Sequence, residues 1–138
     1  MSRFEIVKNE FRKYPRERIR IPVRTDGMSA TYDFYLTEDV AFHNSYGYRQ
    51  ELVFTDIKVK LAPDEVLLLF IRNSVGTKNN IMLANGTSVI NSSYYGNSSN
   101  DGNIGLSLYY YGDKDRVFLK KGTRIAQGII VKYQTVDN

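Results

Sequence analysis

The sequence predicts an all-β fold, and three observations support this prediction. Apolar residues recur at every second position, the apolar segments are short, and turns rich in Gly, Asn and Asp separate them. The 138 residues are 42% hydrophobic and 25% charged, which suits one globular domain over residues 1–138. Many short strands between tight turns are typical of a barrel or a sandwich.

Five segments carry the strand pattern. Residues 66–71 are continuously apolar, so we expect this strand to be covered on both faces. Within residues 52–61 the alternation changes phase at Thr55 and Asp56, which predicts a β-bulge. Turns are expected at residues 63–65 and 121–122. The expected strands cover residues 32–36, 52–61, 66–71, 104–110 and 124–133.

The composition excludes several kinds of catalytic and metal site. The sequence contains no cysteine, and its single histidine is His43. Thiol nucleophiles, disulfides and Cys/His zinc sites are therefore excluded, and a Ser-His-Asp triad is not expected. Any catalysis must use carboxylates, hydroxyls, amides and cations.

The positive charge is concentrated in a basic N-terminal segment, residues 1–20, and its immediate continuation. The net charge is +4. Up to Arg24 the chain has eight basic and three acidic residues, a local charge of +5, so the remainder is close to neutral. A phosphate-binding arm is one interpretation, and a solvated face or a subunit contact is the other. Nucleic acid is the weakest partner hypothesis, because aromatic residues are not interleaved with these arginines.

The sequence predicts a soluble, cytoplasmic protein that does not contact membranes. Charged residues interrupt the only short apolar run at the start, unlike in a signal peptide, and no stretch approaches membrane-spanning length. The long polar connection over residues 91–103 is rich in Asn, Ser and Gly. A loop of this length in a compact β domain is more often functional than incidental.

Four segments, taken in order, carry a family resemblance: residues 24–34, 71–78, 83–97 and 121–129. They resemble the first four motifs of the deoxyuridine triphosphatase (dUTPase) family, and the resemblance extends over residues 21–133. The letters YYGN followed by NDG are similar to some phage and Gram-positive members. The resemblance implies a β-barrel of jelly-roll type, a homotrimer with active sites shared between subunits, and hydrolysis of dUTP to dUMP and pyrophosphate with Mg²⁺ on the triphosphate.

The first two motifs imply residues for the metal and the phosphates. Asp33 matches the acidic residue of the first motif, which supports the metal from its outer shell through water. Arg72, Asn73 and Ser74 occupy the Arg-Ser-Ser positions of the second motif, which serve the phosphates and the subunit contact. Asn73 replaces a serine, and its amide can still donate and accept hydrogen bonds.

The fourth motif implies further phosphate contacts through Arg124 and Gln127, with Gln127 as a donor to the phosphates. Family members usually add a fifth, Gly-rich motif near the C-terminus, which closes over the triphosphate. We expect this motif to be absent, because the sequence after Lys132 does not contain it. Such lids supply backbone N–H groups and exclude water, so weaker binding and turnover are expected without one.

The third motif implies the nucleoside pocket. Tyr94 would lie against the deoxyribose and exclude a 2′-hydroxyl, and the hairpin would read uracil through its backbone. Ser88 stands where the family has glycine, and it would be strained if the site needs positive φ. The residues that match this motif are Asn85, Val89, Ile90, Tyr94 and Gly96.

Asn91 is the main departure from the family pattern. It occupies the position of the Asp that orients the attacking water, and an amide cannot accept a proton at neutral pH. Loss of a positioned base typically removes roughly 10²–10⁴-fold of the rate. Ser93 replaces a second acidic residue, while Asp101, the nearest remaining acid, is either a substitute base or a turn residue. Two hypotheses stay open: a dUTP diphosphatase of impaired activity, and an inactive nucleotide-binding or regulatory trimer that acts through protein partners.

Overall fold

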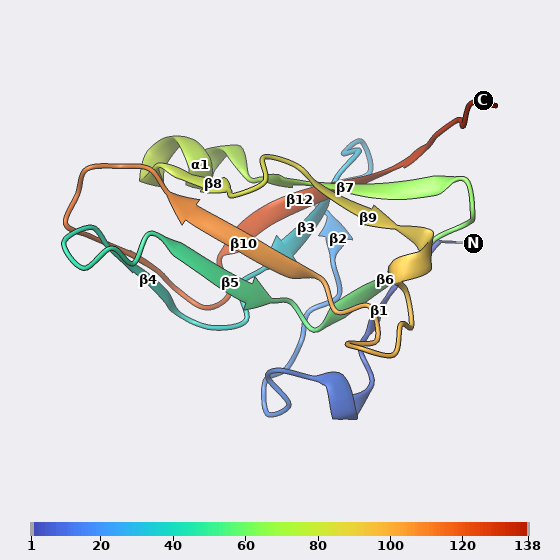
Figure 1. Ribbon diagram of the computed structural model, residues 1–138, viewed down its shortest axis with the longest axis horizontal. Coiled ribbons are helices and arrows are strands. Elements are labelled where there is room, and N and C mark those ends of the chain that lie inside the picture. The colour runs from blue at the N-terminus through green and yellow to red at the C-terminus, as the bar shows by residue number, and fades with distance from the viewer. Residues whose placement is uncertain (1, 138) are drawn as a thin grey trace.

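The computed structural model describes residues 2–137 and consists mainly of β-strands (Figure 1). The described residues contain one short α-helix, α1 (Asn73–Asn79), and two 3-10 helices, η1 (Asn9–Phe11) and η2 (Ser92–Tyr94). The strands are β1 (Arg3–Ile6), β2 (Val23–Arg24), β3 (Tyr32–Tyr35), β4 (Val40–His43), β5 (Gln50–Phe54), β6 (Ile57–Lys60), β7 (Glu65–Ile71), β8 (Ile81–Leu83), β9 (Ser88–Asn91), β10 (Gly105–Tyr110), β11 (Arg116–Leu119) and β12 (Arg124–Lys132).

The strands form four antiparallel sheets around one hydrophobic core. The largest sheet has the order β2-β3-β12-β7-β9, and β5-β10-β8 packs across from it (Figure 1). The other two sheets are the strand pairs β11-β4 and β1-β6. The all-β prediction is therefore confirmed. The pairings between residues 2 and 137 do not join into a closed ring, so the closed barrel stays a prediction.

The phase change at residues 55–56 lies at a corner between two sheets. Ile104 bonds both Thr55 and Ile57 there, which leaves Asp56 as an extra residue between them, as the predicted bulge requires. Strand β5 ends at Phe54 and pairs with β10, whereas β6 begins at Ile57 and pairs with β1. Between them Asp56 adopts a left-handed conformation with φ 58°. This turn redirects the chain from one sheet into the other.

Strand β7 is fully covered on one face and only partly on the other, where Val66 is buried, so the expected cover on both faces is met only in part. Leu67 and Leu69 point into the core with no exposed surface, but Phe70 is 36% exposed. Side chains of directly paired residues in antiparallel strands lie on the same side of the sheet. The register pairs Phe70 with Gln127 and Gln127 with Asp33, and it pairs Leu68 with Val89. We call the side that carries these residues the outer sheet face.

Helix α1 was not predicted from the sequence. It follows β7 directly and packs on β8, where Gly76 fits closely: a Cβ atom there would lie 3.1 Å from the Ile81 carbonyl oxygen. The helix ends at Asn80, which has φ 56°. Residues 2–137 include no helix long and apolar enough to cross a bilayer.

The basic N-terminal segment lies against the body of the fold. Strand β1 pairs with β6, and the chain then passes through η1 below the corner between β5 and β6 (Figure 1). The backbone N–H of Lys8 donates to Asp101 Oδ2 at 2.9 Å. The segment is thus fixed to the polar loop that follows β9.

Candidate functional site

A groove of about 660 Å³ lies beside β9 and the turn that joins β8 to it. These two strands belong to different sheets, so the segment is not the hairpin that the sequence predicts. One side is β9, the edge strand of the five-stranded sheet, and the other is the polar loop that leads into β10. Seven of the residues singled out with the third motif line it. The lining residues are Asn85, Ser88, Val89, Ile90, Asn91, Ser93, Tyr94, Asn97, Ser99, Asn100 and Gly105.

Strand β9 offers free backbone groups along the groove. Among residues 2–137 it pairs only with β7, through residues Ser88 to Asn91, so within this range N–H and C=O groups on its other edge have no strand partner. Ser88 is an ordinary first residue of this strand and is not one of the described residues with positive φ. The strain expected from replacing glycine there does not occur. Its Oγ lies 3.3 Å from Nδ2 of Asn85.

Tyr94 forms part of the groove wall from the end of η2. Its hydroxyl donates to the Asn103 carbonyl oxygen at 2.6 Å and accepts from Asn100 Nδ2 at 2.8 Å. Gly96, which the third motif also singles out, does not line the groove. It takes a turn conformation with φ 69°, and its N–H donates to the Asp101 carbonyl oxygen at 3.2 Å.

All the lining residues of the groove are uncharged. Asn91 and Ser93 lie where the family resemblance implies acidic residues. None of the other lining residues is an aspartate or a glutamate. Amides and hydroxyls can orient a water molecule by hydrogen bonds. A carboxylate would be needed to take its proton at neutral pH.

Asp101 is committed to a structural ion pair. Its side chain is 2% exposed and accepts from Lys58 Nζ at 2.7 Å and from the Lys8 N–H. Burial opposes ionisation, but the hydrogen bonds from Lys58 and Lys8 outweigh it, so the pKa of Asp101 lies below its ordinary value. Asp101 also has φ 61°, as a turn residue does. The turn interpretation therefore fits better than a substitute base.

A second group of predicted residues lies on the outer sheet face. Asp33 is 3% exposed, and its Oδ2 accepts from Thr25 Oγ1 at 2.9 Å. A guanidinium nitrogen of Arg124 lies 3.5 Å from the same oxygen. Gln127 is the direct cross-strand partner of Asp33. The structure thus brings the acid of the first motif and the residues of the fourth motif together.

The residues of the second motif lie where β7 passes into α1. Arg72 precedes the helix, and its N–H donates to the Ile125 carbonyl oxygen at 2.9 Å. This bond places it beside the fourth motif. Asn73 and Ser74 begin the helix and are exposed.

The groove residue Asn91 and the cationic residue Arg72 are far apart in one chain. Asn91 pairs with Val66 near the start of β7, and Arg72 comes six positions after Val66. At about 3.3 Å per residue, they are separated by ~20 Å along the strand. One chain therefore does not bring the groove and the cationic group to the same point.

Four lining residues were not singled out individually from the sequence. Asn97, Ser99 and Asn100 come from the polar loop, and Gly105 begins β10. The only sequence signal for the loop residues was the composition of residues 91–103. It predicts a functional loop but does not identify which amides face the groove.

Comparison with known proteins supports the expectation drawn from the motifs. The dUTPase family profile matches residues 17–138. The chain is 31% identical to a deoxyuridine 5′-triphosphate nucleotidohydrolase of Lactococcus lactis over 134 residues, 97% of this chain and 84% of that protein. It is also similar to a dUTPase structure from Streptococcus mutans, with 29% identity, 99% of both chains covered and a TM-score of 0.82. The fold alone is shared with the dUTPase of Staphylococcus bacteriophage 80alpha bound to dUpNHpp, with 19% identity, 100% and 86% coverage and a TM-score of 0.74.

Proposed function

The chain belongs to the dUTPase family, and from this premise we propose that its groove binds the deoxyuridine part of dUTP. Members of the family hydrolyse dUTP in general. In this chain, we propose, hydrolysis to dUMP and pyrophosphate is slow because Asn91 stands where a base is needed. The uncharged lining of the groove carries this proposal.

The groove fits a neutral nucleoside better than a charged group. Backbone groups on the free edge of β9 can pair with the uracil edge, and the Tyr94 ring can lie against the sugar. Asn91 can hold a water molecule near the α-phosphorus but cannot accept its proton. We therefore expect the groove to bind dUTP but the rate of hydrolysis to be lower than with a carboxylate at position 91.

The residues that would serve the triphosphate are Arg72, Arg124 and Gln127, with Asn73 and Ser74 as further polar groups. Their cations and donors can neutralise and orient phosphate oxygens. dUTPases generally use Mg²⁺, which neutralises the triphosphate when bound. Mg²⁺ usually keeps several waters and is held mainly by phosphates. The buried Asp33, with one oxygen already engaged by Thr25 and Arg124, fits an outer-shell role through water.

We place the complete site between copies of the chain in a homotrimer. The ~20 Å between Asn91 and Arg72 supports this arrangement, since another copy could supply the cations that the groove lacks. The outer sheet face also presents apolar side chains, with Val89 57% exposed, which favours burial against a second copy.

The alternative is a nucleotide-binding or regulatory trimer without catalysis, acting through protein partners. The uncharged lining of the groove favours this alternative too, because a groove without a catalytic base can still bind a nucleotide. The phage 80alpha dUTPases of similar fold are described as controlling transfer of virulence genes. A protein partner of this chain is thus the second candidate.

Pyrophosphate release from dUTP, dCTP and dTTP with Mg²⁺ tests the first proposal. We expect slow release that is greatest with dUTP. Calorimetry with dUpNHpp and Mg²⁺ separates binding from turnover. Binding without release would favour the regulatory alternative, and no heat at millimolar dUpNHpp would contradict both uses of the groove.

Replacing Tyr94 with alanine should weaken dUpNHpp binding, because the ring forms one wall of the groove. We expect a loss of roughly 10-fold or more, as for loss of a stacking aromatic. Tyr46→Ala is the control, since Tyr46 is exposed and lies outside the groove. Equal affinity of the Tyr94→Ala and Tyr46→Ala variants would place the nucleotide elsewhere.

A further inference from the structure

The hydroxyl of Tyr94 is fixed from two sides. It donates to the Asn103 carbonyl oxygen at 2.6 Å, and the Asn100 side-chain amide donates to it at 2.8 Å. Two bonds at one hydroxyl leave the ring little freedom to rotate or tilt. A wall that excludes a ribose 2′-hydroxyl by steric contact depends on such restriction.

Asn100 is itself held by the loop around it. Its Oδ1 accepts from Asn97 Nδ2 at 2.9 Å and from the Gly102 N–H at 3.0 Å. Asn97 also donates to the Tyr94 carbonyl oxygen at 2.7 Å. The oxygen of Asn100 therefore builds the turn, while only its NH₂ group reaches the tyrosine hydroxyl.

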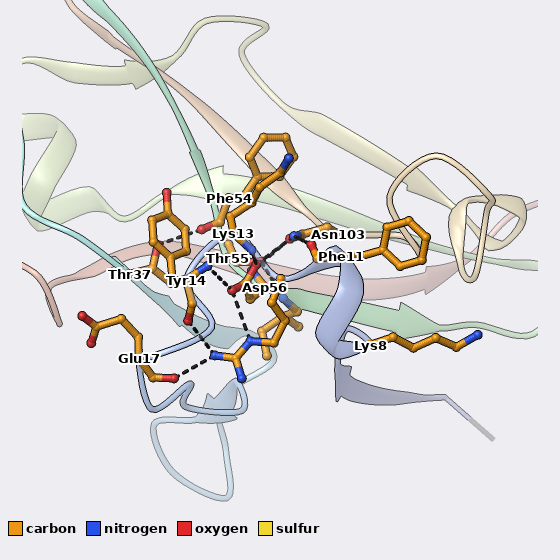
Figure 2. Close-up of polar contacts among 12 residues, drawn as sticks. Lys8, Phe11, Lys13, Tyr14, Glu17, Thr37, Phe54, Thr55, Asp56 and Asn103 are labelled. Carbon is orange, nitrogen blue, oxygen red and sulfur yellow. Dashed lines mark hydrogen bonds and ion pairs between the residues drawn. The ribbon is translucent and has the colours of Figure 1, made fainter.

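The second partner of Tyr94 is anchored on the basic N-terminal segment. Asn103 is fully buried and exchanges two 2.9 Å hydrogen bonds with Asp56, one to its carboxylate and one from its N–H. Figure 2 shows Asp56 between Asn103 and the backbone of Lys13 and Tyr14, whose N–H groups donate to the carboxylate at 2.9 Å. The Arg12 guanidinium lies 3.4 Å from the same carboxylate.

We propose that Asn100 is a positioning residue that acts through Tyr94, and that the Asp56–Asn103 pair braces the opposite side of the same hydroxyl. The inference rests on the proposed function of the groove and adds the origin of its sugar selectivity. Residues 12–14 then have a role other than nucleic-acid binding, because they fix the carboxylate that holds Asn103. Nucleotide selectivity is thereby connected to a segment outside the groove.

Asn100→Asp tests the proposal with little change in shape. An aspartate keeps the oxygen that accepts from Asn97 and Gly102 but replaces the NH₂ donor with an acceptor oxygen. The Tyr94 hydroxyl then cannot accept from residue 100, and it can donate either to Asn103 or to residue 100 but not to both. Ser98→Asp is the matched control: it adds the same charge to the same loop, and Ser98 is exposed and outside the groove lining. The affinities of dUpNHpp and of its ribose counterpart UpNHpp are measured by calorimetry with Mg²⁺ for both variants and the parent.

We expect Asn100→Asp to reduce the preference for the deoxy analogue roughly fivefold, the effect of one lost hydrogen bond. Ser98→Asp should leave this preference within about twofold of the parent. In a Tyr94→Phe background the hydroxyl is missing, so Asn100→Asp should cause no further loss. Equal preferences in the Asn100→Asp and Ser98→Asp variants would overturn the proposal.

NMR of the protein without nucleotide distinguishes the positioning role of Asn100 from the proposed function of the groove. The ring resonances of Tyr94, assigned by comparison with Tyr94→Phe, should broaden or shift in Asn100→Asp and stay unchanged in Ser98→Asp. If the parent does not bind dUpNHpp, the proposed function fails, and the ring resonances alone decide the positioning role. An unchanged Tyr94 ring in Asn100→Asp would contradict that role.

Discussion

Asp56 and Asp101 are buried and surrounded by donors, whereas the groove beside them is lined only by neutral side chains. Both acids hold the basic N-terminal segment to the rest of the fold, through the backbone of residues 8, 13 and 14. The groove contains amides and hydroxyls where a hydrolytic site would need a base. The comparison indicates that the carboxylates in this part of the chain stabilise the fold, while the groove retains groups suited to binding.

Adding a carboxylate to the groove should have the largest effect. Asn91→Asp supplies a group that can accept a proton from water, so we expect pyrophosphate release from dUTP to rise roughly 10²–10⁴-fold. Ser99→Asp is the control, because it places the same charge elsewhere in the lining. An equal rate in the parent and the Asn91→Asp variant would show that Asn91 does not replace a missing base.

Removing the charge of Asp56 should cost the most stability. Asp56→Asn places an NH₂ group against the donating N–H group of Lys13 or Tyr14 and leaves the Arg12 guanidinium without its carboxylate partner. We expect the free energy of unfolding in urea to fall by about 3 kcal/mol. In the control Asp64→Asn, an exposed carboxylate is changed, and the loss should stay below about 1 kcal/mol. Equal stability of the two variants would contradict a clamping role for Asp56.

Asp101→Asn should have a smaller effect that depends on pH. The variant leaves Lys58 buried without its closest partner, so we expect a loss of about 2 kcal/mol at pH 7. The pKa of Asp101 lies below its ordinary value of 3.8 in the folded protein. Its contribution is therefore complete above the unfolded pKa and is lost as the pH falls through the lower, folded value. Urea unfolding from pH 7 to pH 2 should show the parent and the variant converging at low pH, and a constant difference would argue against this ion pair.

The sequence predicted strands such as β3, β10 and β12, because apolar and polar residues alternate along them. It did not predict α1, because the segment from Asn73 to Asn79 has weak helix formers and Gly76. That helix depends on close packing against β8, which is a tertiary contact. The interruption of alternation at Asp56 predicted the extra residue but not the change of sheet, because only the pairing partners of β5 and β6 reveal the corner.

The motifs located the groove more fully than its supporting contacts. Seven lining residues were singled out from the sequence because the family resemblance fixes their register. The partners of Tyr94, namely Asn100 and the carbonyl of Asn103, were not, because a loop of similar amides gives no spacing signal. The hydrogen bond between Asn103 and Asp56 joins two turns that are 47 positions apart in the chain. The local sequence patterns that predict strands carry no information about such a distant contact.

The neutrality of the groove also bears on how protons move when a ligand enters. None of its lining side chains is a carboxylate, a histidine or an amine. Above the second pKa of a phosphate, about 6, a nucleoside triphosphate can therefore occupy the groove without changing the ionisation of the surrounding side chains. Heats of binding would then be independent of the ionisation enthalpy of the buffer, and any dependence would report a titrating group outside the groove, such as one supplied by another copy of the chain.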